Sequence, residues 1–223
     1  MFRRFVSFGQ ALVSLTPHPP AGNLAKHSVC LESIMRRVIE KFDLVDIAAK
    51  LFRMKGYSAT SIDDIARACG LTKGSLYHHF SGKEELAVAA LEQVHQFYRD
   101  SIFTIVRDAE DPSVKELETF NLAVEKFFTE HPHGCLLANL SLEIGGSYEQ
   151  FSPKIRRFFE EWQDCYMIVF SRYFPADEAR HRAADAVAIV QGCILMNRIW
   201  HDVAPLRRQH AAMLERCATA TLS

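Results

Sequence analysis

The stretch that decides the fold is residues 71–86, LTKGSLYHHFSGKEEL, which fits a short helix with only one buried side. Thr72 is a favourable N-cap, and Leu76 and Phe80, four residues apart, fall on one face of a helix. The remaining side chains are mostly small, hydroxyl-bearing, charged or aromatic. The stretch therefore predicts a short helix with an apolar inner face and an outer face that can approach another molecule closely.

A second short helix is predicted immediately upstream, over residues 62–69. Its buried stripe consists of apolar and small residues at helical spacing, namely Ile62, Ile65, Ala66 and Cys69. Thr60 or Ser61 is expected to cap this helix, and Gly70 can take the positive φ of a tight turn. Two short helices joined by a glycine-containing turn predict a helix-turn-helix.

Outside this motif the sequence pattern predicts helices throughout. An apolar row between residues 38 and 52 predicts a first helix that ends at Gly56, and residues 83–106 predict one long helix with an acidic first turn. Breaks at proline and glycine separate further expected helices at 113–130, 134–145, 151–173, 177–201 and 205–220. With no strand-like alternation, the prediction is an all-α protein of about nine helices.

Three segments are expected along the chain. Residues 1–34 are predicted to be a flexible extension, with an upstream start codon or a weak secretory signal as alternatives. Residues 35–82 are predicted to be a domain that contains the helix-turn-helix, and residues 83–223 a larger helical domain. In the first thirty-four residues the apolar run is interrupted by Ser, Gly and Gln, which disfavours the secretory alternative.

Charge is distributed unevenly, although the formal net charge of the 223 residues is only −1. Residues 36–83 contain nine Lys or Arg against five Asp or Glu, whereas residues 84–223 contain fourteen against twenty-one. An anionic partner is therefore expected for the first part only. Six cysteines without a CxxC pair suggest a reduced, cytoplasmic protein, and no window of 18 apolar residues predicts a membrane span.

The second helix of a helix-turn-helix enters the major groove, so its exposed residues are the candidates for DNA contact. Gly74 permits close approach, Tyr77 and His78 are placed to reach phosphates, and Lys83 adds a charge beside the amides of the next helix. The full set of predicted DNA-binding residues is Thr60, Ser61, Thr72, Lys73, Gly74, Ser75, Tyr77, His78 and Lys83.

The stretch GYSATSIDDIARACGLTKGSLYHHFSGKEEL closely resembles the DNA-binding signature of the TetR/AcrR family of transcriptional regulators. The similarity covers residues 36–86 and includes the order and spacing of the glycines, caps, aromatic pair and lysine. Many relatives have Ser, Asn or Asp where this chain has Gly82, a change that costs a helix cap only a few tenths of a kcal/mol. The resemblance implies that residues 35–82 are a three-helix DNA-binding domain, the reading head. It implies that residues 83–223, which begin with a connecting helix, are a helical domain that binds an effector and dimerises. It further implies a regulator, usually a repressor, and no cofactor.

The last two predicted helices carry two apolar faces each, which indicates one burial inward and one against a partner. In the first of them one row is Ala183, Val187, Val190 and Ile194, and the other is Ala186, Ile189, Cys193, Met196 and Trp200. In the second, one side holds Leu206, Met213 and Cys217, and the other holds Ala211, Leu214 and Ala218. We therefore expect a homodimer through these helices that reads a palindromic DNA operator.

The effector site is predicted less directly. Aromatic and polar residues in the helical domain are the candidates: Asn139, Trp162, Tyr166, Phe170 and Gln191. The Gly-Cys-Leu at Cys135 resembles a subgroup of TetR-type regulators, some of which respond to electrophiles or oxidants through that cysteine. Near a helix N-terminus, with His131 and His133 close in sequence, Cys135 is a candidate for a reactive thiolate. A cysteine that only packs under the helix start is the favoured alternative.

Other functions are less well supported by the sequence. A metal site from His131, His133 and Cys135 contains Pro132 and lacks a fourth ligand nearby, so no metal is predicted. No catalytic triad order or phosphate loop emerges, so no enzyme is predicted. A structural DNA-binding protein without an effector remains an alternative, but the acidic body argues against it. An activator also remains an alternative to a repressor.

Overall fold

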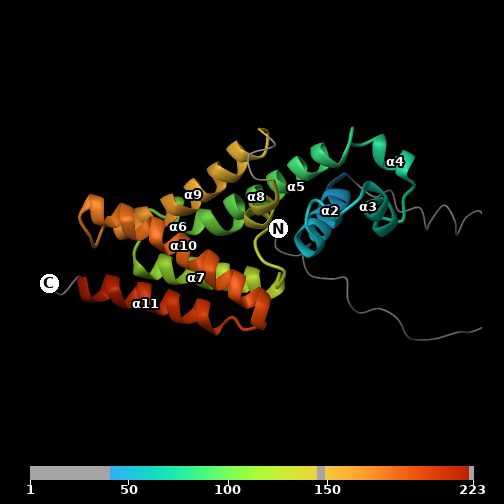
Figure 1. Cartoon of the computed structure of the whole chain (residues 1–223). Helices are drawn as coiled ribbons and strands as arrows, with labels where there is room; N and C mark the ends of the chain where they lie inside the picture. The colour runs from blue at the N-terminus through green and yellow to red at the C-terminus, as the bar shows by residue number, and fades with distance from the viewer. Residues whose placement is uncertain (1–40, 145–148, 221–223) are drawn as a thin grey trace, which may run out of the picture. The chain divides into compact units, whose positions relative to one another are not determined.

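The computed structural model describes residues 41–144 and 149–220 (Figure 1). All of them belong to one compact unit, residues 39–223, so the domain boundary expected after residue 82 stays a prediction. The extension predicted for residues 1–34 lies outside the described residues. Every described element is a helix, as predicted, and none is long and apolar enough to cross a membrane.

Three helices form the reading head: α2 (Lys41–Lys55), α3 (Ile62–Ala68) and α4 (Lys73–Tyr77). Gly56 ends α2 with φ +88°, a conformation that favours glycine. Ser61 caps α3 through a reciprocal capping box with Asp64, and Thr72 caps α4 by accepting a hydrogen bond from the Ser75 amide at 3.1 Å. Both short helices therefore begin where their caps predict.

Helix α4 is shorter than predicted, because it ends at Tyr77 and not at Phe80. The amides of His79 and Phe80 both donate to the Leu76 carbonyl oxygen, at 3.0 and 3.1 Å, which closes the helix with a tight turn. Leu76 and Phe80 are buried, which confirms the predicted inner face.

One helix connects the head to the body, as predicted, with a change of winding inside it. It consists of α5 (Lys83–Tyr98), the π-helical segment η1 (Arg99–Phe103) and α6 (Thr104–Arg107). At the π segment, Arg99 Nε donates to Glu161 Oε2 of α9 at 2.6 Å. Such single π turns often occur at functional positions.

The body contains α7 (Val114–Glu130), α8 (Leu136–Ile144), α9 (Ser152–Phe170), α10 (Ala176–Trp200) and α11 (Ala204–Ala220). With α5, η1 and α6 taken as one helix, the described residues form nine helices and no strand. Large aromatic side chains dominate the body core, among them Tyr98, Phe103, Phe158 and Trp162, all essentially without solvent exposure. Figure 1 shows α10 in contact with α9 and with α11, the pairing that the apolar rows require.

Candidate nucleic-acid interface and effector region

The outer face of α4 is open to solvent. Thr72, Lys73, Gly74, Tyr77 and His78 are all exposed, and Tyr77 is exposed at 47% although it is large and partly apolar. A side chain at Gly74 would meet no atom closer than 3.8 Å, so glycine leaves the helix surface bare at this point. An exposed helix face with one basic residue, hydroxyls and a bare backbone suits docking in the major groove.

Two polar residues of α4 are engaged locally. The Lys73 ammonium lies 3.4 Å from Asp63 of α3, but both side chains are more than half exposed, so the pair is weak and Lys73 is able to exchange it for a phosphate. Ser75 is half-buried and its hydroxyl lies 2.8 Å from the Thr72 hydroxyl, so Ser75 helps to form the cap of α4.

The Thr60 hydroxyl was predicted to contact DNA, but the structure buries it. Thr60 is fully buried, and its hydroxyl donates to the Gly56 carbonyl oxygen at 2.6 Å, which stabilises the turn after α2. Ser61 is exposed at the start of α3 and donates from its hydroxyl to Asp64 at 2.7 Å. The hydrogen bonds from Ser61 lower the pKa of Asp64.

Lys83 does not point into free solvent at the start of α5. Its ammonium donates to the Tyr57 carbonyl oxygen at 3.0 Å and lies 4.3 Å from the centre of the Tyr57 ring. This cation–π contact ties the first turn of α5 to the loop after α2. Beside it, a cleft of about 600 Å³ is lined by Tyr57, Ser81, Gly82, Lys83, Glu84, Glu85, Val88 and Gln150.

Two side chains of α8 form hydrogen bonds with the backbone at the C-terminal end of α2 and in the loop after it. The Glu143 carboxylate accepts hydrogen bonds from the Tyr57 amide at 3.0 Å and the Ser58 amide at 2.8 Å. A side chain at Gly56 would lie 2.4 Å from Glu143 Oε1, so this approach also requires glycine. Asn139, predicted as an effector contact, donates instead to the Arg53 carbonyl oxygen at 3.4 Å and to the His133 carbonyl oxygen at 3.2 Å.

Cys135 lies in the interior as a packed residue and not as an accessible thiol. Cys135 does lie directly before α8, but it is buried, and desolvation raises the pKa of its thiol. The amides of Ala138 and Leu137 and the charge of Arg53 lower that pKa in part and do not reverse the shift. His131 supplies no positive charge, because burial lowers its pKa. A thiol in an apolar interior stays protonated even beside a helix N-terminus.

Three of the other predicted effector residues, Trp162, Tyr166 and Phe170, follow one another along α9, where the Tyr166 and Phe170 rings stack with centres 5.7 Å apart. Trp162 and Tyr166 are fully buried in the aromatic core, where the Tyr166 hydroxyl donates to Asn121 Oδ1 at 3.3 Å and burial raises the pKa of Tyr166. Gln191 is half-buried, and its enclosed amide nitrogen has only the weak Cys135 thiol beside it. Phe170 is the member of the predicted set that lines the pocket between α9, α10 and α11.

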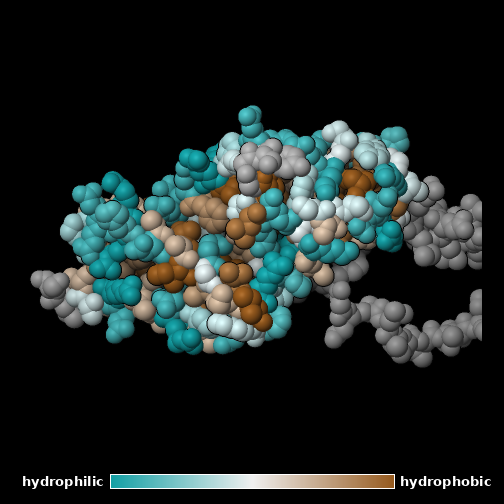
Figure 2. Space-filling view, in the orientation of Figure 1, coloured by the Kyte–Doolittle hydropathy of each residue, from teal (hydrophilic) through white to brown (hydrophobic). Residues whose placement is uncertain are grey.

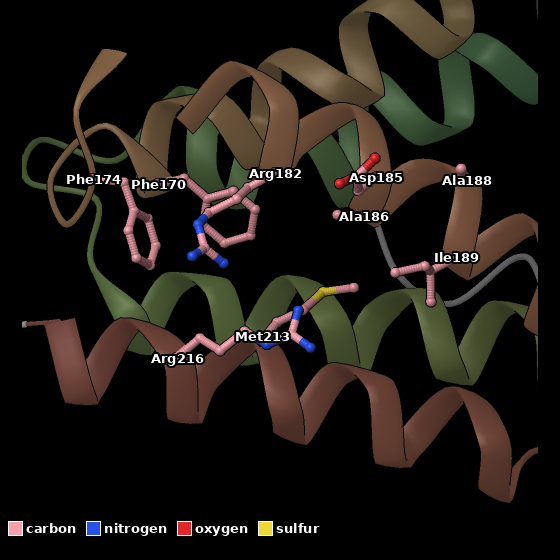
Figure 3. Close-up of a pocket in the computed structure, with 9 residues that line it drawn as sticks. All are labelled: Phe170, Phe174, Arg182, Asp185, Ala186, Ala188, Ile189, Met213 and Arg216. Carbon is pink, nitrogen blue, oxygen red and sulfur yellow. The ribbon is translucent and has the colours of Figure 1, made fainter. Parts of the chain in front are cut away.

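That pocket has a volume of about 240 Å³ (Figure 3). It is lined by Phe170, Phe174, Arg182, Asp185, Ala186, Ala188, Ile189, Met213 and Arg216. The Arg182 guanidinium lies 4.1 Å from the centre of the Phe174 ring, and Figure 3 shows Met213 and Arg216 extending from α11 into the space below α10. Across the part of the chain that the structure describes, no three His, Cys, Asp or Glu side chains are grouped to hold a metal ion.

The outer side of α10 presents apolar residues to solvent (Figure 2). Leu195, Ile199 and Trp200 are each at least half exposed, and Gly192 has open space around it. Of the two predicted rows, the first is buried within the protomer, whereas the second runs from buried Ala186 to exposed Trp200. On α11, Leu206, Met213 and Cys217 are buried, and Ala211 and Ala218 are exposed, as the two-faced pattern predicts.

Comparison with known proteins identifies both halves of the chain. Residues 44–90 match the family described as bacterial regulatory proteins of the tetR family, and residues 114–212 match the LmrA/YxaF-like C-terminal domain of transcriptional regulators. The HTH-type transcriptional repressor DhaR of Mycobacterium sp. (strain GP1) is 30% identical over 84% of this chain and 96% of its own length. The HTH-type transcriptional regulator LmrA of Bacillus subtilis is 28% identical over 73% of this chain and 88% of its own length.

Solved structures agree with this assignment. A TetR-family transcriptional regulator from Agrobacterium tumefaciens superposes with a TM-score of 0.69 and 26% identity, over 79% of this chain and 96% of that protein. A TetR regulator from Chloroflexus aurantiacus gives a TM-score of 0.66 and 26% identity, over 78% and 92% of the two chains. These relatives and neighbours are all transcriptional regulators. The chain therefore belongs to the TetR family of bacterial transcriptional regulators.

Proposed function

We propose that this regulator is a repressor that binds a palindromic operator as a homodimer and leaves it when a small molecule binds non-covalently in the helical body. The observation that carries this proposal is the exposed outer face of α4 on a head that α8 holds through Glu143 and Asn139. Repression is favoured because the relative DhaR is a repressor. A non-covalent effector is favoured because Cys135 is buried and its thiol has a raised pKa.

The proposed DNA contacts come from the exposed residues around α4. Lys73 and Tyr77 are assigned to the operator first, because both side chains are exposed and neither is needed to cap a helix. Ser61, Thr72, Gly74 and His78 lie on the same exposed surface. Lys83 reaches a phosphate only by leaving the Tyr57 carbonyl oxygen, which gives it a secondary role.

The proposed dimer interface is the outer side of α10 together with α11. Exposed large apolar side chains gather at Leu195, Ile199 and Trp200, while the small Ala184, Ala188 and Gly192 allow a partner helix to approach closely. Two such helices from each protomer form a four-helix interface, the packing that suits long two-faced helices. The interface would place two reading heads on the two halves of one operator.

Effector control requires that the ligand stabilise a conformation with a different head position. Helix α8 is the proposed link, because it begins directly after buried Cys135, and Glu143 near its C-terminal end binds the loop after α2. A coupling of about 1–3 kcal/mol would change operator affinity about 5–150-fold.

The test is fluorescence anisotropy titration of the purified protein on the DNA upstream of its own gene, since such regulators often control neighbouring genes. Lys73→Ala is expected to weaken binding about tenfold and Tyr77→Phe somewhat less, each through loss of one DNA contact. Lys115→Ala, which removes an exposed lysine from α7, is the matched control and should leave affinity unchanged. Full affinity in both α4 variants would remove α4 as the reading helix.

A further inference from the structure

The interior where α2 meets the body contains hydrogen-bond donors that lack acceptors. Two enclosed side-chain atoms in this region, Arg53 Nε and Tyr98 Oη, have no hydrogen-bond partner, and a third, Gln191 Nε2, has only the weak Cys135 thiol beside it. They come from α2, α5 and α10, so three helices far apart in the sequence direct them inward. Native proteins leave few buried polar groups unpaired, and a group of them requires an explanation.

Arg53 is the most unusual of the three. It is only 5% exposed, yet no carboxylate among the described residues lies within ion-pair distance of its guanidinium. Asp46, the acidic residue that acts on it electrostatically, is paired with Lys50 at 2.8 Å. Burial lowers the pKa of Arg53, but a guanidinium remains charged in proteins. Arg53 is therefore a buried cation without an anion.

The neighbours of Arg53 do not supply the missing charge. Tyr98 and Cys135 both interact electrostatically with Arg53, but burial raises the pKa of each, so both are neutral at physiological pH. His131, which also acts on Arg53, has a pKa lowered by burial and donates from Nδ1 to the Phe127 carbonyl oxygen at 2.8 Å. The cluster therefore presents one positive charge and several donors to an enclosed region.

Aromatic rings surround these donors. The Phe127 ring lies 5.8 Å from the Arg53 guanidinium carbon and 4.9 Å from the Tyr98 ring, measured to ring centres. The Trp162 ring centre lies 5.5 Å from that of Tyr98. A guanidinium with further donors beside aromatic rings matches a carboxylate attached to a flat apolar body.

We propose that Arg53, Tyr98 and Gln191 form the anchoring site for the carboxylate of the effector, and that the effector is a small organic acid with a planar apolar body. This inference rests on the proposed function, because it assigns a ligand class to the effector-controlled repressor. Arg53 belongs to α2 of the reading head, so an anion bound to Arg53 acts directly on the position of the head. Entry requires the body helices to separate, which couples ligand binding to the head position.

The experiment compares acids with their neutral amides on the full chain. Benzoate and acetate are titrated against benzamide and acetamide, and the melting temperature is followed. At a hundredfold excess over its Kd, benzoate is expected to raise Tm by about 5–10 °C, with no comparable rise for benzamide. Arg53→Met should abolish the rise, and Arg157→Met, which removes an exposed arginine of α9, should retain it. Equal effects of acids and amides would overturn the proposal.

The ligand-free proteins give a second readout that separates a binding role from a structural one. Because Arg53→Met replaces an unpaired buried charge by an apolar side chain of similar length, its Tm without ligand is expected to rise by about 3 °C. A lower Tm would show that Arg53 is a structural residue and overturn the proposal. Should the methionine variant fail to fold, Arg53→Lys takes its place and should weaken benzoate binding at least tenfold.

Operator titrations of the same proteins separate this inference from the proposed function. Tight operator binding with no preference for acids refutes the ligand class and leaves the repressor intact. A preference for acids with no operator binding refutes the proposed function and leaves the anion site intact.

Discussion

Helices α4 and α8 are both short, but they use their polar residues in opposite ways. On α4 the polar side chains face solvent, and the strongest of them, Lys73, has only a weak exposed partner. On α8 Asn139 and Glu143 are bonded to the backbone of the loop and helix that carry the head. A surface that binds DNA needs polar side chains that are free to contact DNA. A link between head and body needs polar side chains that are hydrogen-bonded within the protein.

The largest expected effect separates the two faces of α4. Leu76→Ala should lower the free energy of unfolding by about 3 kcal/mol, because Leu76 is fully buried and its removal leaves a cavity. His79→Ala, in the exposed turn directly after α4, should change it by less than about 0.5 kcal/mol. Urea denaturation followed by circular dichroism measures both. Similar losses in the two variants would contradict the division of α4 into an inner and an outer face.

A smaller effect is expected at the link made by α8. Glu143→Gln should raise the hydrogen-exchange rate of the Tyr57 and Ser58 amides about tenfold, because a neutral amide is a weaker acceptor than a carboxylate. Hydrogen-exchange mass spectrometry of the loop reports this change. Glu130→Gln, an exposed residue at the end of α7, is the control and should leave the loop unchanged. Unaltered exchange in Glu143→Gln would mean that α8 does not hold the head.

The smallest expected effect concerns the connecting helix. Burial opposes the charge of Glu161, but hydrogen bonds from Arg99, His95 and Arg157 lower its pKa to about 2. A carboxylate with a depressed folded-state pKa stabilises the protein above its unfolded pKa, and that stability is lost as the pH falls from about 4.5 to about 2.

After allowance for solvent screening, the hydrogen bonds and charge pairs of Glu161 contribute about 1 kcal/mol to the free energy of unfolding. Glu161→Gln should therefore lower the free energy of unfolding at pH 6 by this amount and leave it less dependent on pH below 4.5. Denaturation at pH 6 and pH 3 measures the difference. Asp63→Asn, which removes the exposed partner of Lys73, is the control and should alter neither value appreciably.

Local patterns predicted the reading head well, because its determinants lie within a few residues of one another. Thr72 and Ser61 cap their helices, and Leu76 and Phe80 are buried, as their spacing requires. Thr60 was wrongly assigned to the DNA surface, because a threonine before a helix start fits either a cap or a buried turn. The burial of Thr60 depends on packing against α2, which is not part of the local pattern.

The effector region was predicted poorly, because its residues meet only through packing. A cysteine at a helix N-terminus predicts a low pKa when it is exposed, but α2 and α10 enclose Cys135 and reverse the shift. Arg53 was missed because an arginine in the last turn of a helix is ordinarily a surface residue that complements the dipole. One signal was available: Arg53 follows Phe52 inside the apolar row of α2.

The sequence by itself determined the all-α class, the helix boundaries to within a few residues, the helix-turn-helix and the family. These follow from periodicity, caps and glycines, which act over one or two helical turns. The tertiary structure alone decided that Thr60 and Cys135 are buried, that Glu143 holds the loop after α2, and that Arg53 has no carboxylate partner among residues 41–144 and 149–220. Burial and charge pairing depend on which distant helices come together, and a local pattern carries no record of those contacts.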